Sequence, residues 1–85
     1  MTLDEIRKEI DGIDAQLLPL FIRRMECAKQ VAAVKKERNL PVFNGGREQE
    51  ILERIGGQAG EYGGETRILY SNMMDMSRAL QYSLL

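Results

Sequence analysis

The chain has 85 residues and a nearly balanced charge, because 12 basic and 13 acidic side chains give a formal net charge of -1. This balance argues against binding to nucleic acid or to a membrane surface through bulk charge, so any site for an anion must be local. One cysteine and no histidine exclude a disulfide framework, a Cys/His zinc site and a histidine general base. The sequence contains neither a signal peptide nor an apolar run long enough to cross a bilayer, and a cytoplasmic location is the expectation.

An apolar seam runs through residues 3–38 in steps that alternate between three and four residues. This heptad pattern is typical of a helix that lies along another helix. Such a helix would be about 52 Å long, whereas a compact domain of this length has a radius of gyration of about 12 Å. The seam therefore predicts a helical homodimer, with Cys27 as a small core residue. Its members are Leu3, Ile6, Ile10, Ile13, Leu17, Leu20, Arg24, Cys27, Val31 and Val34.

Pro19 falls inside this predicted helix. A proline there removes one hydrogen bond and clashes with the preceding turn, at a cost of about 3 kcal/mol. The seam nevertheless keeps its phase across Pro19, and no turn-forming residue flanks it. We therefore expect a continuous, kinked helix, capped by Thr2 or Asp4, rather than a hairpin of two helices.

Two shorter helices are expected after the long one. Asn39 and Pro41 end the long helix. Residues 40–46 are expected to form a connector to the second helix. The further helices are predicted over residues 47–55 and 65–83. Five glycines lie between those two helices, so residues 56–64 are predicted to form a mobile loop. The chain is thus expected to be one all-α domain over residues 1–85, with a long, a short and a medium helix. The expected apolar face of the third helix comprises Ile68, Leu69, Met73, Met76, Leu80 and Leu84.

Arg24 is the one cation within the seam, which makes it the first candidate for a functional residue. Arg24 and Lys35 are three turns apart on one helix face, about 16 Å along the axis, with Ala28 and Val31 between them. Two cations so placed resemble the ends of a groove for a compact dianion, although each could instead pair with a carboxylate or reach solvent. Arg7 is about 26 Å from Arg24, so it could complete this site only from the second chain of an antiparallel dimer.

The shorter helices carry further candidates. Arg47 and Glu48 open the second helix, where Glu48 can accept a hydrogen bond from a ligand hydroxyl and Arg47 adds positive charge. A solvated helix start is the alternative for both. Ser77 and Gln81 are one turn apart, so their side chains project from one edge of the third helix.

In their order and spacing, these residues resemble the all-helical class of chorismate mutase. The resemblance covers essentially the whole chain. It implies an intertwined homodimer with two sites, each built from both chains, and the rearrangement of chorismate to prephenate. This pericyclic step needs no cofactor, metal ion or nucleophile. The segments that carry the resemblance are Ile6 to Asp14, Arg24, Lys35, Pro41-Val42, Arg47-Glu48, and Ser77 with Gln81.

The resemblance also implies residue roles. Arg24 and Arg7 of the partner subunit would bind the two substrate carboxylates, while Lys35 and Gln81 would donate hydrogen bonds to the ether oxygen. Glu48 would hold the ring hydroxyl, Ser77 would contact a carboxylate and Arg47 would support the site. Asn44 stands where the family usually has an aspartate, and its amide can still bind a hydroxyl. The implied catalytic residues are Lys35, Gln81, Arg24 and Arg7, and the implied substrate-binding residues are Arg7, Arg24, Lys35, Asn44, Arg47, Glu48, Ser77 and Gln81.

Two other functions fit the same residues. An isochorismate pyruvate-lyase on the same scaffold would need much the same cations. A non-catalytic helical dimerisation module would use the seam alone, and its cations would be dispensable. The chain could be a free-standing enzyme or the mutase portion of a longer bifunctional protein.

Overall fold

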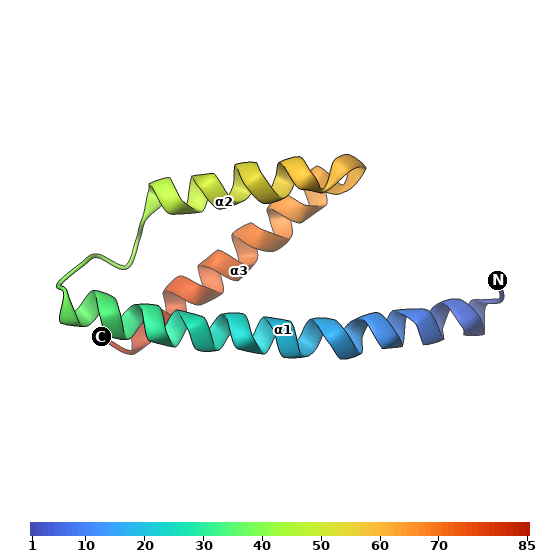
Figure 1. The fold of residues 1–85 in the computed structure, drawn as a ribbon, viewed down its shortest axis with the longest axis horizontal. Coiled ribbons are helices and arrows are strands. Elements are labelled where there is room, and N and C mark those ends of the chain that lie inside the picture. Colours follow the sequence, from blue (N-terminus) through green and yellow to red (C-terminus); the bar gives the residue numbers. More distant parts are fainter.

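The computed structural model describes residues 1–85 and confirms the all-α class. It contains α1 (Leu3–Glu37), α2 (Gly45–Gln58) and α3 (Gly63–Ser83), with a 3₁₀ turn at Gly60–Tyr62. Helix α3 contacts both other helices, whereas α1 and α2 do not contact each other. The amino-terminal half of α1 projects beyond the rest of the chain (Figure 1), which gives an elongated shape of 54 × 24 × 15 Å. None of the three helices combines the length and the apolar character that crossing a membrane would require.

Helix α1 passes through Pro19 without a break, as predicted. At its start the Thr2 hydroxyl accepts a hydrogen bond from the backbone N–H of Glu5 at 3.2 Å. At its end Asn39 has a positive φ of 55°, and the backbone N–H of Leu40 donates to the carbonyl of Lys35 at 2.7 Å. This left-handed turn satisfies carbonyls that the helix end leaves free, and it directs the chain into the connector.

The predicted mobile loop at residues 56–64 is wrong. Helix α2 continues to Gln58, the 3₁₀ turn follows, and α3 already begins at Gly63. Both Gly56 and Gly63 are buried, and a Cβ atom on Gly63 would lie only 3.0 Å from the carbonyl oxygen of Gly56. These glycines therefore let two helices approach closely. Gly60 has a φ of +60°, a conformation that favours glycine.

The core of the single chain is small and lies where the helices meet. Its buried apolar side chains are Ala28, Ala32, Val42, Ile51 and Met74. Because α3 is the helix that α1 contacts, the two buried alanines of α1 allow a close approach between these helices.

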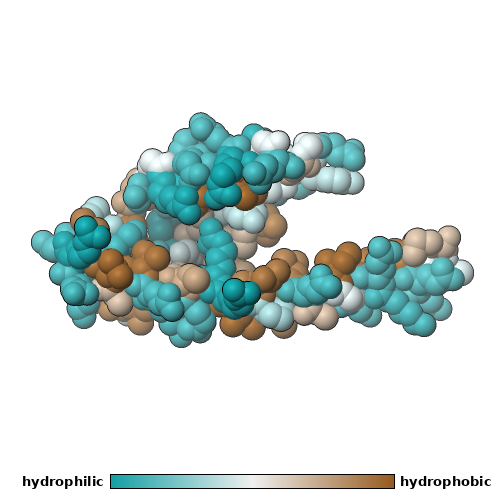
Figure 2. Space-filling view, in the orientation of Figure 1, coloured by the Kyte–Doolittle hydropathy of each residue, from teal (hydrophilic) through white to brown (hydrophobic).

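Most of the predicted seam is exposed in the single chain. Every residue from Met1 to Leu20 is exposed, and apolar side chains gather along α1 in Figure 2. Cys27, predicted as a core residue, is also exposed. No other element of the chain covers the amino-terminal half of α1.

The expected apolar face of α3 is mostly uncovered in the single chain. Ile68, Leu69 and Met76 are exposed, whereas Met74 and Gln81 are buried. The face of α3 that carries Met74, Ser77, Arg78 and Gln81 lines a cavity between the helices, and the apolar stripe points away from it. Helix α3 thus adds a second apolar surface to that of α1.

Substitution of the two adjacent glycines that open α3 tests this packing. We expect Gly63→Ala to lower the free energy of unfolding by about 1–3 kcal/mol, because its Cβ atom would press on the Gly56 carbonyl. Gly64→Ala is the control, since a Cβ atom there meets nothing within 4 Å and should stabilise the helix by up to about 1 kcal/mol. Urea unfolding at one fixed protein concentration measures both. Equal effects of the two substitutions would contradict the close approach.

Candidate active site

A cavity of about 310 Å³ lies among the three helices and the connector. The structure brings together on its wall seven of the eight predicted substrate-binding residues. Arg7 does not join them, because it lies on the exposed half of α1. The seven are Arg24, Lys35, Asn44, Arg47, Glu48, Ser77 and Gln81.

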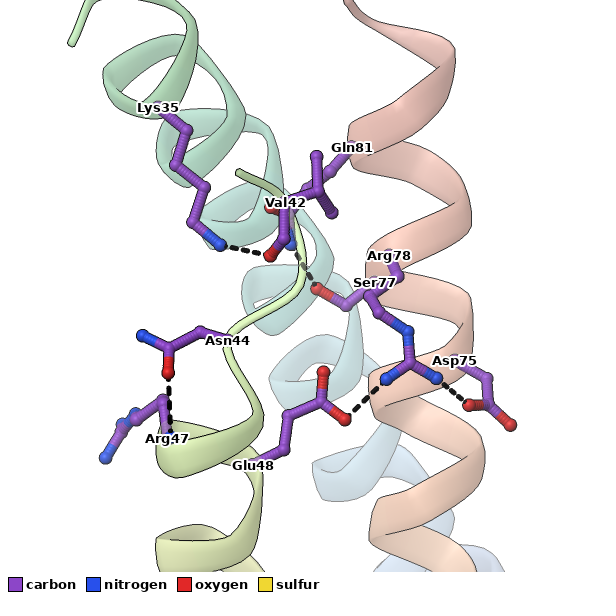
Figure 3. A network of polar contacts seen from close by, with 9 residues as sticks. All are labelled: Lys35, Val42, Asn44, Arg47, Glu48, Asp75, Ser77, Arg78 and Gln81. Carbon is purple, nitrogen blue, oxygen red and sulfur yellow. Dashed lines mark hydrogen bonds and ion pairs between the residues drawn. The ribbon is translucent and has the colours of Figure 1, made fainter. Parts of the chain in front are cut away.

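Lys35 enters the cavity from the last turn of α1 (Figure 3). Its Nζ donates to the backbone carbonyl of Val42 at 2.5 Å, and Val42 is buried in the connector. An ammonium group has three N–H donors, so two remain for a ligand. The connector therefore orients Lys35 without cancelling its charge.

Arg24 is held by an aromatic ring. Its guanidinium carbon lies 5.7 Å from the ring centroid of Tyr70 on α3, within the range of a cation–π interaction. Neither Arg24 nor Lys35 forms an ion pair within the chain, so pairing with a carboxylate, the alternative raised for each, does not occur. Tyr70 was not predicted, because only the packing of α3 on α1 brings it to Arg24.

Gln81 and Ser77 interact as their spacing predicts. The Gln81 Nε2 donates to the Ser77 hydroxyl at 3.0 Å, and the Gln81 side chain is only 5% exposed. The amide oxygen Oε1 is buried and has no partner. An unsatisfied buried polar atom costs about 1–3 kcal/mol, and such atoms are found at functional sites. One N–H of Gln81 also remains available.

Asn44 and Arg47 form the rim of the cavity at the start of α2. The Asn44 Oδ1 accepts a hydrogen bond from the backbone N–H of Arg47 at 3.0 Å, so this oxygen caps the helix. The Arg47 side chain donates to Glu50 at 2.5 Å, and Figure 3 shows it pointing away from Glu48. The hydrogen bond from Arg54 is the main cause that lowers the pKa of Glu50, and the charge of Arg47 adds to it.

Arg78 is a cavity residue that sequence reasoning missed. It reaches from α3 to α2, where its guanidinium donates to Glu48 at 2.5 Å, and it also binds Asp75. The hydrogen bond with Glu48 is the main cause that raises the pKa of Arg78, which adds to the preference of a guanidinium group for its charged form. The sequence spacing could have identified Arg78 as a cavity residue, because it lies three residues before Gln81 and shares its side of the helix.

A model of the family described as chorismate mutase type II matches residues 6–82. The chain belongs to the chorismate mutase type II family. Among curated proteins, the chorismate mutase of Methanocaldococcus jannaschii is 34% identical over 82 residues, which cover 93% of this chain and 83% of that protein.

Two longer relatives match over part of their length. The bifunctional chorismate mutase/prephenate dehydratase of Aquifex aeolicus is 45% identical over 53 residues, which cover 62% of this chain and 15% of that protein. The T-protein of Haemophilus influenzae is 39% identical over 51 residues, which cover 60% of this chain and 14% of that protein. Comparison with solved structures gave no significant match. The family and these relatives support chorismate mutase activity, an isomerisation, for this chain.

The capping role of Asn44 predicts that two substitutions at this position differ in their effect on stability. We expect Asn44→Ala to lower the free energy of unfolding by about 1 kcal/mol, because the first turn of α2 loses its side-chain acceptor. Asn44→Asp is the matched control, since a carboxylate accepts the same bond and is favoured at a helix N-terminus. Urea unfolding followed by circular dichroism measures both. Equal stability of Asn44→Ala and the wild type would show that the cap contributes nothing.

Proposed function

We propose that this chain converts chorismate to prephenate, in aromatic amino-acid biosynthesis, within the cavity described above. The observation that carries the proposal is the convergence of Arg24, Lys35 and Gln81 on one cavity, each with hydrogen-bond donors not satisfied by a carboxylate of the chain. Chorismate is a compact dianion. A locally cationic cavity in a protein with a net charge of -1 fits such a ligand.

Binding of the two carboxylates would rest on arginine. The guanidinium of Arg24 presents a planar fork of donors that matches a carboxylate, and its contact with Tyr70 restrains it. The hydroxyl of Ser77 would add a contact to a carboxylate, and Glu48 would accept a hydrogen bond from the ring hydroxyl. These contacts hold a flexible substrate in the compact conformer that reacts, which lowers the entropic part of the barrier.

Acceleration would come from Lys35 and Gln81. In the rearrangement the ether carbon–oxygen bond breaks as a carbon–carbon bond forms, so no proton or electron pair is exchanged with the protein. Negative charge grows on the ether oxygen in the transition state. Donors already fixed in place stabilise that charge with little reorganisation. Lys35 is fixed by the Val42 carbonyl and Gln81 by Ser77.

The second carboxylate would be bound by Arg7 of the partner subunit in an intertwined homodimer. Within one chain Arg7 lies outside the cavity, on the half of α1 where every residue is exposed. The uncovered seam on this half and the apolar stripe of α3 offer surfaces that a second copy would bury. A dimer would thus cover these surfaces and complete two sites at once.

A direct test of the reaction is chorismate consumption with identification of the product. We expect the wild type to form prephenate, and Arg24→Ala and Gln81→Ala each to lower kcat/KM by about a hundredfold or more, since each removes a donor aimed at the substrate. Arg23→Ala, a change at an exposed position next to Arg24, is the control and should retain activity.

The alternatives predict other outcomes of this assay. Cleavage of isochorismate with release of pyruvate, and no reaction with chorismate, would identify the lyase. Inertness toward both substrates in a folded dimer would leave dimerisation as the function.

The sharing of each site between two chains can be tested by mixing inactive variants. Arg7→Ala and Arg24→Ala are refolded together in equal amounts, so that half of the dimers contain one chain of each kind. In such a heterodimer one site has both arginines intact and the other has neither. We therefore expect about a quarter of the wild-type activity to return.

A mixture of Arg24→Ala with Gln81→Ala is the matched control for this experiment. Both residues come from the same chain in the proposed site, so every heterodimer site lacks one of them and activity should stay low. Failure of the first mixture to recover activity, with heterodimers confirmed by mass spectrometry, would contradict the role of Arg7 across the interface.

A further inference from the structure

The ion pair between Arg78 and Glu48 differs from every other ion pair of the chain. The others join residues three or four positions apart within one helix. Arg78 and Glu48 are 30 positions apart and connect α3 to α2. Their side chains are 26% and 21% exposed, so the pair is also the least exposed one. An ion pair with little access to water is more strongly coupled than a surface pair.

The two carboxylate oxygens of Glu48 have different surroundings. Arg78 holds Oε1 at 2.5 Å, whereas Oε2 has no hydrogen-bond partner in the chain, and Glu48 lines the cavity. Figure 3 shows the carboxylate reaching from α2 toward Arg78, with its second oxygen free. One oxygen of Glu48 is thus committed to the protein and the other is open to a ligand.

Arg78 is itself restrained on three sides. It binds Glu48 and Asp75, and its guanidinium carbon lies 5.6 Å from the ring centroid of Phe43 in the connector. These contacts occupy two of its terminal nitrogens and one face of the guanidinium group. Arg78 is therefore better placed to hold Glu48 than to bind a ligand directly.

The negative charge of Glu48 would weaken the binding of an anion, and Arg78 compensates for that charge. A carboxylate on the wall of a cavity that binds a dianion repels it, and this repulsion is strong where water is excluded. A guanidinium bound to Oε1 cancels that charge and leaves Oε2 able to accept a hydrogen bond. Such an arrangement lets an acidic side chain select for a hydroxyl in a site for an anion.

We propose that Arg78 is a positioning residue, which fixes Glu48 and offsets its charge so that Glu48 Oε2 receives the ring hydroxyl of the substrate. This role rests on the proposed function, because it acts on the same substrate in the same cavity. It assigns to Arg78 no contact with the substrate itself.

The test is a double-mutant cycle on kcat/KM for chorismate with Arg78→Met, Glu48→Gln and the double variant. We expect Arg78→Met to lower kcat/KM by on the order of tenfold or more, mainly through a higher KM, because the carboxylate is left uncompensated. In the Glu48→Gln background there is no charge to offset, so the same change should alter kcat/KM by less than about threefold. Arg78→Lys retains the charge and should recover part of the loss.

Arg54→Met is the matched control, since it removes an exposed ion pair with Glu50 on α2 and should leave kcat/KM within about twofold. All variants are assayed at a temperature at which circular dichroism shows them folded. A lower melting temperature of Arg78→Met with unchanged kcat/KM would indicate a merely structural role and overturn the proposal.

Two further outcomes separate this proposal from the proposed function. An equal loss from Arg78→Met in both backgrounds would show that Arg78 acts on the substrate without Glu48, which overturns the positioning role while the reaction stands. A wild type that is inactive toward chorismate would overturn both.

Discussion

The close contact between helices at small residues is the constraint on which the rest of this structure depends. The buried positions on α1 are two alanines, Ala28 and Ala32, and two buried glycines, Gly56 and Gly63, lie where α2 turns into α3. Small side chains let helix backbones approach, and the longer side chains beside them then meet across the remaining space. The cavity lies beside these contacts, and Ala28 itself lines it.

The cavity combines positive charge with fixed geometry because its cations are held by groups other than carboxylates. A backbone carbonyl holds Lys35 and an aromatic ring lies against Arg24. A carboxylate partner would orient each cation equally well but would cancel the charge that a dianion needs. Glu48 is the one acidic side chain on the cavity wall, and Arg78 offsets it. The cavity wall therefore has a net positive charge, which an anionic ligand would balance.

The sequence predicted much of this site because its residues repeat with the helical period. Arg24 and Lys35 share a face of one helix, so their convergence follows from their spacing alone. Arg78 was missed because its partner lies on another helix, and only the packing of α3 on α2 joins them. The glycine-rich segment was misinterpreted for a related reason, since glycine favours a loop when judged locally. At Gly63 the absence of a side chain instead serves a close helix contact, and tertiary packing decided the outcome.

The small core of the single chain gives the proposed dimer a thermodynamic basis. Only eight of 85 residues are buried, and five of these are apolar side chains other than glycine. Chains of this size need most of their apolar surface buried to offset the conformational entropy lost on folding. The apolar side chains that could supply that burial lie exposed along α1 and α3, where a second copy could cover them. In the proposed dimer, folding and association would be one process, and stability would rise with protein concentration. The helix that carries Arg7 would then become part of the packed structure in the step that completes the active site.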